Sequence, residues 1–286
     1  MSKAALIADL KARIAACEAG AGGRAADAIA QKAISLGHGG LDAALPGGGL
    51  KQGALHEVAA AEYRDMGAAT GFLAALAARC QRIAGNEAPL LWCQLAAPPF
   101  DMGPLYAPGL AGFGLDPARL ILASPARPVE LLWVLEEALR AGALCGVVGE
   151  IDGRSATLDL TATRRLQLAA EETGTPVLLF TGHRREGEGG TSAASTRWVV
   201  GPAPGVEDVA EDMGRDFFSA GFPGLVGSPR WHVRLQRVKG GSPGSWLLRW
   251  RAEEAVFEIE DGLEEKTLSP STDHFPVEAF PVRRTG

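Results

Sequence analysis

The spacing of hydrophobic positions changes repeatedly along the chain and predicts strands that alternate with helices. Short runs that are almost wholly apolar precede longer stretches in which apolar residues recur every three or four positions. The predicted strands of this central region are Ala54–Val58, Leu90–Leu95, Leu120–Ala123, Leu144–Val148, Val177–Thr181 and Arg197–Val200. The predicted helices are Gly67–Ala84, Val129–Ala141 and Thr157–Thr173.

Strands that are apolar on both faces are typical of a sheet that helices cover on both sides. Because strands and helices alternate, we expect right-handed crossover connections between parallel strands. The pattern from about Ile34 to Val200 therefore predicts an α/β fold with a mostly parallel, helix-covered sheet.

The pattern changes after this region, where prolines and glycines interrupt residues 202–229. Three further strands are predicted at Trp231–Val238, Ser245–Arg251 and Ala255–Ile259. The glycine-rich turn 239–244 predicts that the first two form an antiparallel hairpin. In the first of them apolar and polar residues alternate, which predicts one buried and one solvated face. The fold should therefore carry a C-terminal antiparallel hairpin extension.

Both ends of the chain differ from the central region. Apolar residues at helical spacing near the N-terminus predict an amphipathic helix, which docks either on the protein's own core or on a partner. From about Asp261 the chain is first acidic and then rich in serine, proline and threonine, as flexible tails are. We expect an arm at residues 1–30, a domain at 31–260 and a tail at 261–286. The tail is interpreted either as a partner-docking segment with Phe275, Val277 and Phe280 as anchors, or as a strap on its own domain.

Charge and cysteine content narrow the class of protein. A net charge of −6 argues against a general nucleic-acid coat, so any DNA contact needs a local basic patch. The four cysteines lack metal-binding spacing and lie in apolar runs, as reduced core cysteines of a cytoplasmic protein do. No apolar run is long enough to cross a membrane, so we expect no membrane contact. Two basic groups are candidate DNA or partner contacts, with a solvated surface as the alternative for each: Arg184 and Arg185, and Arg234, Arg237 and Lys239.

Two segments carry a family resemblance. The run Leu41-Asp42, Leu45-Pro46-Gly47-Gly48-Gly49-Leu50 and Gly53-Ala54-Leu55-His56-Glu57-Val58 resembles the lead-in to the first core strand of RecA-type proteins. Residues 230–246 fit the pattern RWxVRLxRxxGGxPGxW, which resembles a hairpin typical of the ImuA proteins, bacterial RecA-like accessories of SOS mutagenesis. The resemblance implies a RecA-like core that works with an ImuB-like inactive Y-family polymerase homologue. The resemblance also implies that the protein acts together with an error-prone replicative-type DNA polymerase without binding it directly. RecA is a further candidate partner.

The phosphate-binding elements of a RecA-type core are absent from the sequence. A P-loop needs G-x-x-x-x-G-K-[ST] between strand and helix, but no lysine occurs between Lys51 and Lys239. The corresponding segment carries Glu62 and Asp65, and its one cation, Arg64, is expected to form a surface salt bridge.

The carboxylates of an ATPase are also missing from the expected places. The strand that should end in a magnesium-binding aspartate is predicted to end at Val148 and to be followed by Gly149, with Glu150 and Asp152 too late. Gln94 lies where RecA has its catalytic carboxylate. We therefore predict a protein that is no enzyme and uses no cofactor. The alternatives are an ATP-dependent recombinase paralogue and a SulA-type inhibitor of a tubulin-like cell-division protein.

Overall fold

The computed structural model of the chain describes residues 33–85, 88–183, 191–203 and 228–260. The predicted N-terminal helix and the tail with Phe275, Val277 and Phe280 lie outside these residues, as do Arg184 and Arg185.

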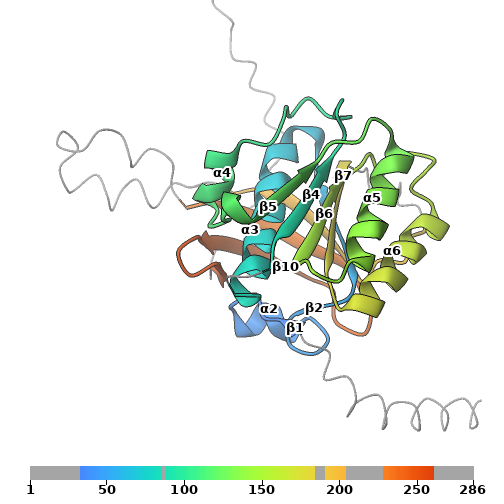
Figure 1. The fold of residues 1–286 in the computed structure, drawn as a ribbon. Coiled ribbons are helices and arrows are strands. Elements are labelled where there is room, and N and C mark those ends of the chain that lie inside the picture. Colours follow the sequence, from blue (N-terminus) through green and yellow to red (C-terminus); the bar gives the residue numbers. More distant parts are fainter. Residues whose placement is uncertain (1–32, 86–87, 184–190, 204–227, 261–286) are drawn as a thin grey trace, which may run out of the picture.

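In the described part of the chain, nine strands form one sheet in the order β11-β10-β9-β8-β3-β7-β6-β4-β5 (Figure 1). Six neighbouring strands run parallel, and the last three along the chain pair antiparallel at one side. The parallel strands are β3 (Leu55–Ala60), β4 (Leu90–Gln94), β5 (Leu120–Ala123), β6 (Gly146–Glu150), β7 (Val177–His183) and β8 (Thr196–Pro202). The antiparallel strands are β9 (Arg230–Val238), β10 (Gly244–Arg251) and β11 (Val256–Ile259). The predicted α/β fold and its antiparallel extension are thus confirmed.

Helices cover the central parallel strands on both faces, which explains why most of their residues are buried and apolar (Figure 1). On one face α3 (Met66–Ile83) and the short α4 (Ala107–Gly112) share a core with the inner face of the antiparallel strands. On the other face α5 (Pro128–Arg140) and α6 (Leu160–Thr173) enclose a second, smaller core. Two short 3₁₀ turns, η1 (Tyr63–Asp65) and η2 (Pro117–Arg119), complete these connections.

The segment before β3 folds as a small unit that the periodicity does not predict. It comprises the two-stranded sheet of β1 (Ala33–Ile34) and β2 (Leu50–Lys51), with the helix α2 (Gly39–Ala43) between them. Asp42 fixes the turn, because its carboxylate accepts hydrogen bonds from the Leu36 amide at 2.7 Å and the Ser35 hydroxyl at 2.6 Å. The Leu36 carbonyl then accepts a bond from the Phe257 amide at 2.9 Å and so ties the unit to β11.

Every predicted strand and helix within the described residues is present, although most boundaries differ by one to three residues, and for two elements the difference has a clear physical reason. The strand predicted at Leu144–Val148 runs instead from Gly146 through Glu150, since Glu150 finds hydrogen-bond donors on the neighbouring strand. The helix predicted from Thr157 begins at Leu160, because the Asp159 side chain accepts a bond from the Ala162 amide and caps it there.

The predicted two-faced strand is also confirmed. In β9 the residues Trp231, Val233 and Leu235 are buried, whereas His232, Arg234 and Gln236 are exposed. The buried set packs towards α3 in the larger core.

The three cysteines within the described residues are buried and unpaired, as predicted for core thiols. Burial raises the pKa of Cys93 to about 12 and that of Cys145 to about 11, and it raises the pKa of Cys80 further. No cluster of metal-ligating side chains occurs in the segments that the structure describes. No helix in these segments is both long enough and apolar enough to cross a membrane.

The turn between β9 and β10 depends on two glycines for different reasons. Gly240 has a φ of +74°, in the left-handed region that disfavours other residues. Gly241 has no such φ, but a side chain there would collide with the Ala44 carbonyl oxygen and with Val238. The same carbonyl accepts a hydrogen bond from the Ser242 amide at 3.1 Å, so the turn lies directly against the segment before β2.

We expect Gly241→Val to lower the free energy of unfolding by about 1–3 kcal/mol, because overpacking must displace the backbone at Ala44. Chemical denaturation of the purified variant measures this loss. Gly67→Ala is the matched control, since an added methyl group there meets nothing within 4 Å. Equal stability of Gly241→Val and the wild type would mean that the turn is a loose linker.

Candidate functional site

The parallel strands of an α/β sheet usually present their ligand site at the carboxyl edge, where the strands end. Here the connection from β3 to α3 lies at that edge and passes through η1. In a nucleotide-binding core this connection holds the phosphates, so its side chains decide whether a phosphate is accepted.

Two carboxylates occupy this connection. Glu62 and Asp65 form a capping box, in which the Glu62 amide donates to the Asp65 carboxylate at 3.1 Å. Burial raises the pKa of Asp65. Arg64 pairs with Glu62 at 3.0 Å and is 80 % exposed, which confirms the predicted surface salt bridge. Two backbone amides of this connection, those of Glu62 and Asp65, are therefore used by the protein's own acids.

A third carboxylate lies at the end of β6, two residues beyond the end that the sequence predicts. Glu150 is buried, and burial raises its pKa. One of its oxygens accepts from the Trp92 indole nitrogen at 2.6 Å and the other from the Gln94 amide nitrogen at 3.1 Å. Both oxygens are engaged by side chains of β4, so Glu150 is part of a buried polar network inside the sheet.

Tyr63 joins the ends of several strands at the same edge. Its hydroxyl donates to Asp101 at 3.0 Å, and its ring meets the His183 ring edge-on with 5.9 Å between centroids. The loops after β3 and β4 and the last residue of β7 are thereby held together at this edge.

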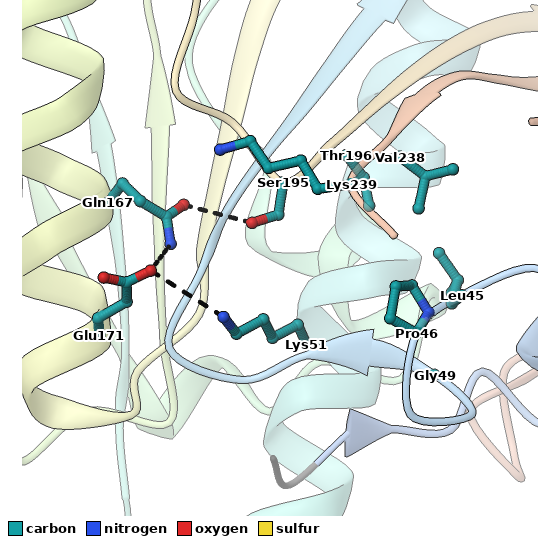
Figure 2. Close-up of a pocket in the computed structure, with 10 residues that line it drawn as sticks. All are labelled: Leu45, Pro46, Gly49, Lys51, Gln167, Glu171, Ser195, Thr196, Val238 and Lys239. Carbon is teal, nitrogen blue, oxygen red and sulfur yellow. Dashed lines mark hydrogen bonds and ion pairs between the residues drawn. The ribbon is translucent and has the colours of Figure 1, made fainter. Parts of the chain in front are cut away.

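The opposite, amino edge of the sheet contains a pocket with a volume of about 270 Å³. Figure 2 shows its polar wall, where Gln167 and Glu171 of α6 face Lys51 and Lys239. The Gln167 amide donates to Glu171 at 2.8 Å, and its oxygen accepts from Ser195 at 3.4 Å. The Lys51 nitrogen lies 4.0 Å from the Glu171 carboxylate, an ion pair without a hydrogen bond.

The structure separates the predicted basic group of the hairpin into two parts. Arg237 and Lys239 lie together, where they donate to the backbone carbonyls of Ser192 and Ala193. Arg234 is exposed on the solvated face of β9, opposite Val199 of β8. Arg184 and Arg185 of the other predicted group belong to the residues that the structure does not describe.

Apolar side chains are exposed at the far side of the sheet, on β5 and α5. Ile121 and Leu122 are 46 % and 58 % exposed on β5, and Trp133 of α5 is 60 % exposed. Within the described residues, β5 pairs with β4 alone and is an edge strand. Exposed apolar residues on an edge strand are typical of surfaces that bind other proteins.

Apart from Lys239, the sequence analysis did not identify the pocket residues or the exposed apolar surface as sites. The pocket combines residues from four distant segments, and no local spacing links them. The exposed surface does have a sequence signal, because Leu120–Ala123 is an apolar strand without the charged or proline residues that usually protect an edge.

A buried histidine forms hydrogen bonds with two residues that line the pocket. His56 of β3 contacts the Lys51 carbonyl through Nε2 and the Thr196 hydroxyl through Nδ1, each at 2.8 Å. The carbonyl only accepts, so Nε2 donates. Burial lowers the pKa of His56 to about 4, with smaller effects from Lys51.

The sequence of the chain is similar to sequences of known proteins, which identifies its family. No protein-family model matches the chain. The chain is similar to "Protein ImuA" from two strains of Caulobacter vibrioides, each 36% identical over 233 residues. The similar region covers 78% of this chain and 84% of each relative.

His56 should make the protein less stable in acid. Unfolded histidine takes up a proton near its ordinary pKa of 6.5, whereas the folded protein resists protonation until about pH 4. Stability due to this residue is therefore lost as the pH falls from 6.5 towards 4, by about 2 kcal/mol between pH 7 and pH 5. Urea unfolding at both pH values should show a smaller loss in His56→Gln, since the buried acids titrate alike in both proteins. An identical loss in both proteins would contradict the assignment.

Proposed function

Because the chain belongs to the ImuA family, we propose that it serves damage-induced mutagenesis by binding other proteins and not by hydrolysing ATP. In this proposal the α/β domain is a scaffold, and its surfaces carry the function. The family membership supports the role in mutagenesis, and the geometry of the carboxyl edge supports the absence of catalysis.

The observation that carries the proposal is the capping box of η1, the turn immediately before α3. A phosphate at this position would meet the carboxylates of Glu62 and Asp65 and the exposed Arg64. Phosphate sites of P-loop proteins instead offer free amides, a lysine and a hydroxyl that holds Mg²⁺. The Glu62 and Asp65 amides of this turn are already bonded to these two carboxylates, so an anion would meet acids there and not free donors.

We propose that the direct partner is an ImuB-like inactive Y-family polymerase homologue. In this proposal an error-prone replicative-type polymerase is an indirect partner, bound through that homologue. RecA is a second proposed partner. The exposed edge of β5 with Ile121 and Leu122 supports binding of this kind, because an unpaired edge accepts a further strand. Protein or DNA contact by Arg184, Arg185 and Arg234, and docking through Phe275, Val277 and Phe280, remain part of the proposal.

We expect Mg-ATP to leave the melting temperature of the purified protein unchanged and to give no heat of binding. A ligand present at 100 times its dissociation constant stabilises a protein by about 2.7 kcal/mol, which such a melting curve detects easily. Micromolar binding together with turnover would contradict the proposal and favour the recombinase paralogue.

We expect Leu122→Lys to weaken binding of the purified ImuB-like partner at least about tenfold, equal to about 1.4 kcal/mol. A lysine on an edge strand opposes pairing with a further strand. Leu168→Lys on α6 is the matched control, since Leu168 is equally apolar and 46 % exposed but lies far from β5 in the fold. Titration calorimetry with each variant provides the comparison.

Equal binding by both variants would show that the edge of β5 is not the interface. Capture of a tubulin-like division protein, with no binding of the ImuB-like partner, would instead favour the SulA-type alternative.

A further inference from the structure

The pocket at the amino edge of the sheet combines a polar wall with an apolar one. Figure 2 shows Leu45, Pro46 and Val238 on the side opposite Gln167 and Glu171. Its volume of about 270 Å³ far exceeds the roughly 10–15 Å³ that a single water needs. The pocket therefore has room for a side chain that is apolar along its stem and polar at its tip.

The polar wall contains two ammonium groups whose N–H donors are only partly used within the described residues. The Lys239 ammonium carries three N–H groups, and one of them is directed at the Ala193 carbonyl. The Lys51 ammonium makes only a long ion pair with Glu171. Two ammonium groups from separate segments thus face one pocket that contains a single carboxylate.

The electrostatic surroundings of Lys239 are positive overall. Burial lowers its pKa most, and the nearby cations Arg237, Lys51 and Arg164 lower it further, while Glu171 alone opposes them. Arg197 adds no free charge, because it pairs with the buried Glu57 at 2.7 Å. An anion in the pocket would relieve this repulsion among the cations.

The parts of the wall are held in place before any ligand arrives. The Gln167 oxygen accepts from the Leu55 amide at 2.9 Å, which fixes α6 against the start of β3. On the other side, the turn at Gly241 lies against Ala44, next to Pro46. Such preorganisation reduces the entropy that binding would otherwise cost.

We propose that this pocket binds the carboxylate of an acidic protein segment, with the stem of the acidic side chain or an apolar neighbour against Leu45, Pro46 and Val238. The charges favour a carboxylate over the phosphates of a nucleic acid. Glu171 offsets one of the two lysines, which leaves about one positive charge in the pocket, enough to match a single carboxylate. The ligand class follows from the lining and does not depend on the proposed function.

The test uses the full chain and fluorescence anisotropy at fixed ionic strength. One probe is a fluorescein-labelled peptide that repeats glutamate-leucine-glycine, and its control has glutamine in place of glutamate. We expect the acidic peptide to bind and the glutamine peptide to bind at least about tenfold more weakly. We expect Lys51→Gln and Lys239→Gln each to weaken binding of the acidic peptide about tenfold.

Arg64→Gln is the matched control, because it removes one positive charge at the opposite edge and should leave the affinity unchanged. Melting curves establish that each variant is folded, and Lys51→Gln keeps the Lys239 contact with Ala193 intact. Equal binding of both peptides, or an equal loss in Arg64→Gln, would overturn the proposal. Tighter binding of labelled single-stranded DNA that needs the same two lysines would also overturn it, in favour of a nucleic-acid site.

Discussion

Phe72 of α3 meets Trp198, Trp231 and Phe257, aromatic residues of β8, β9 and β11, with ring centroids 5.2–5.9 Å apart. These rings lie in the larger core, which the parallel strands share with the antiparallel extension. Truncation of a buried phenylalanine typically costs about 3–5 kcal/mol, and here the cavity would open between the two halves of the sheet. Since β9 also places Lys239 at the pocket, the position of the amino-edge site depends on this aromatic contact.

The two edges of the sheet carry charged side chains that are mainly of opposite sign. At the carboxyl edge, Glu62 and Asp65 form the capping box of η1, and Glu150 accepts hydrogen bonds from two side chains of β4. At the amino edge, two lysines face a pocket with one carboxylate. The polar groups of this one α/β sheet are thus arranged differently at its two edges.

The sequence predicts the strands, the helices and the two-faced β9 because each depends on the local spacing of apolar residues. It fails at Glu150, where a charged residue suggests the end of a strand but Trp92 and Gln94, more than fifty positions away, supply the missing hydrogen bonds. The pocket is unpredictable for the same reason, since Lys51, Gln167 and Lys239 meet only after the sheet has formed. The basic pair Arg237 and Lys239 was identified as a candidate site, but the backbone carbonyls that orient it were not.

The buried thiols have a consequence for the conditions under which the protein works. Oxidants such as peroxides attack the thiolate and not the protonated thiol, and Cys93 and Cys145 have pKa values of about 12 and 11. At neutral pH these residues and Cys80 are therefore almost entirely protonated and shielded from solvent. Peroxides should therefore react only slowly with these three thiols while the domain is folded, so the core cysteines need no reducing partner to stay in the thiol form.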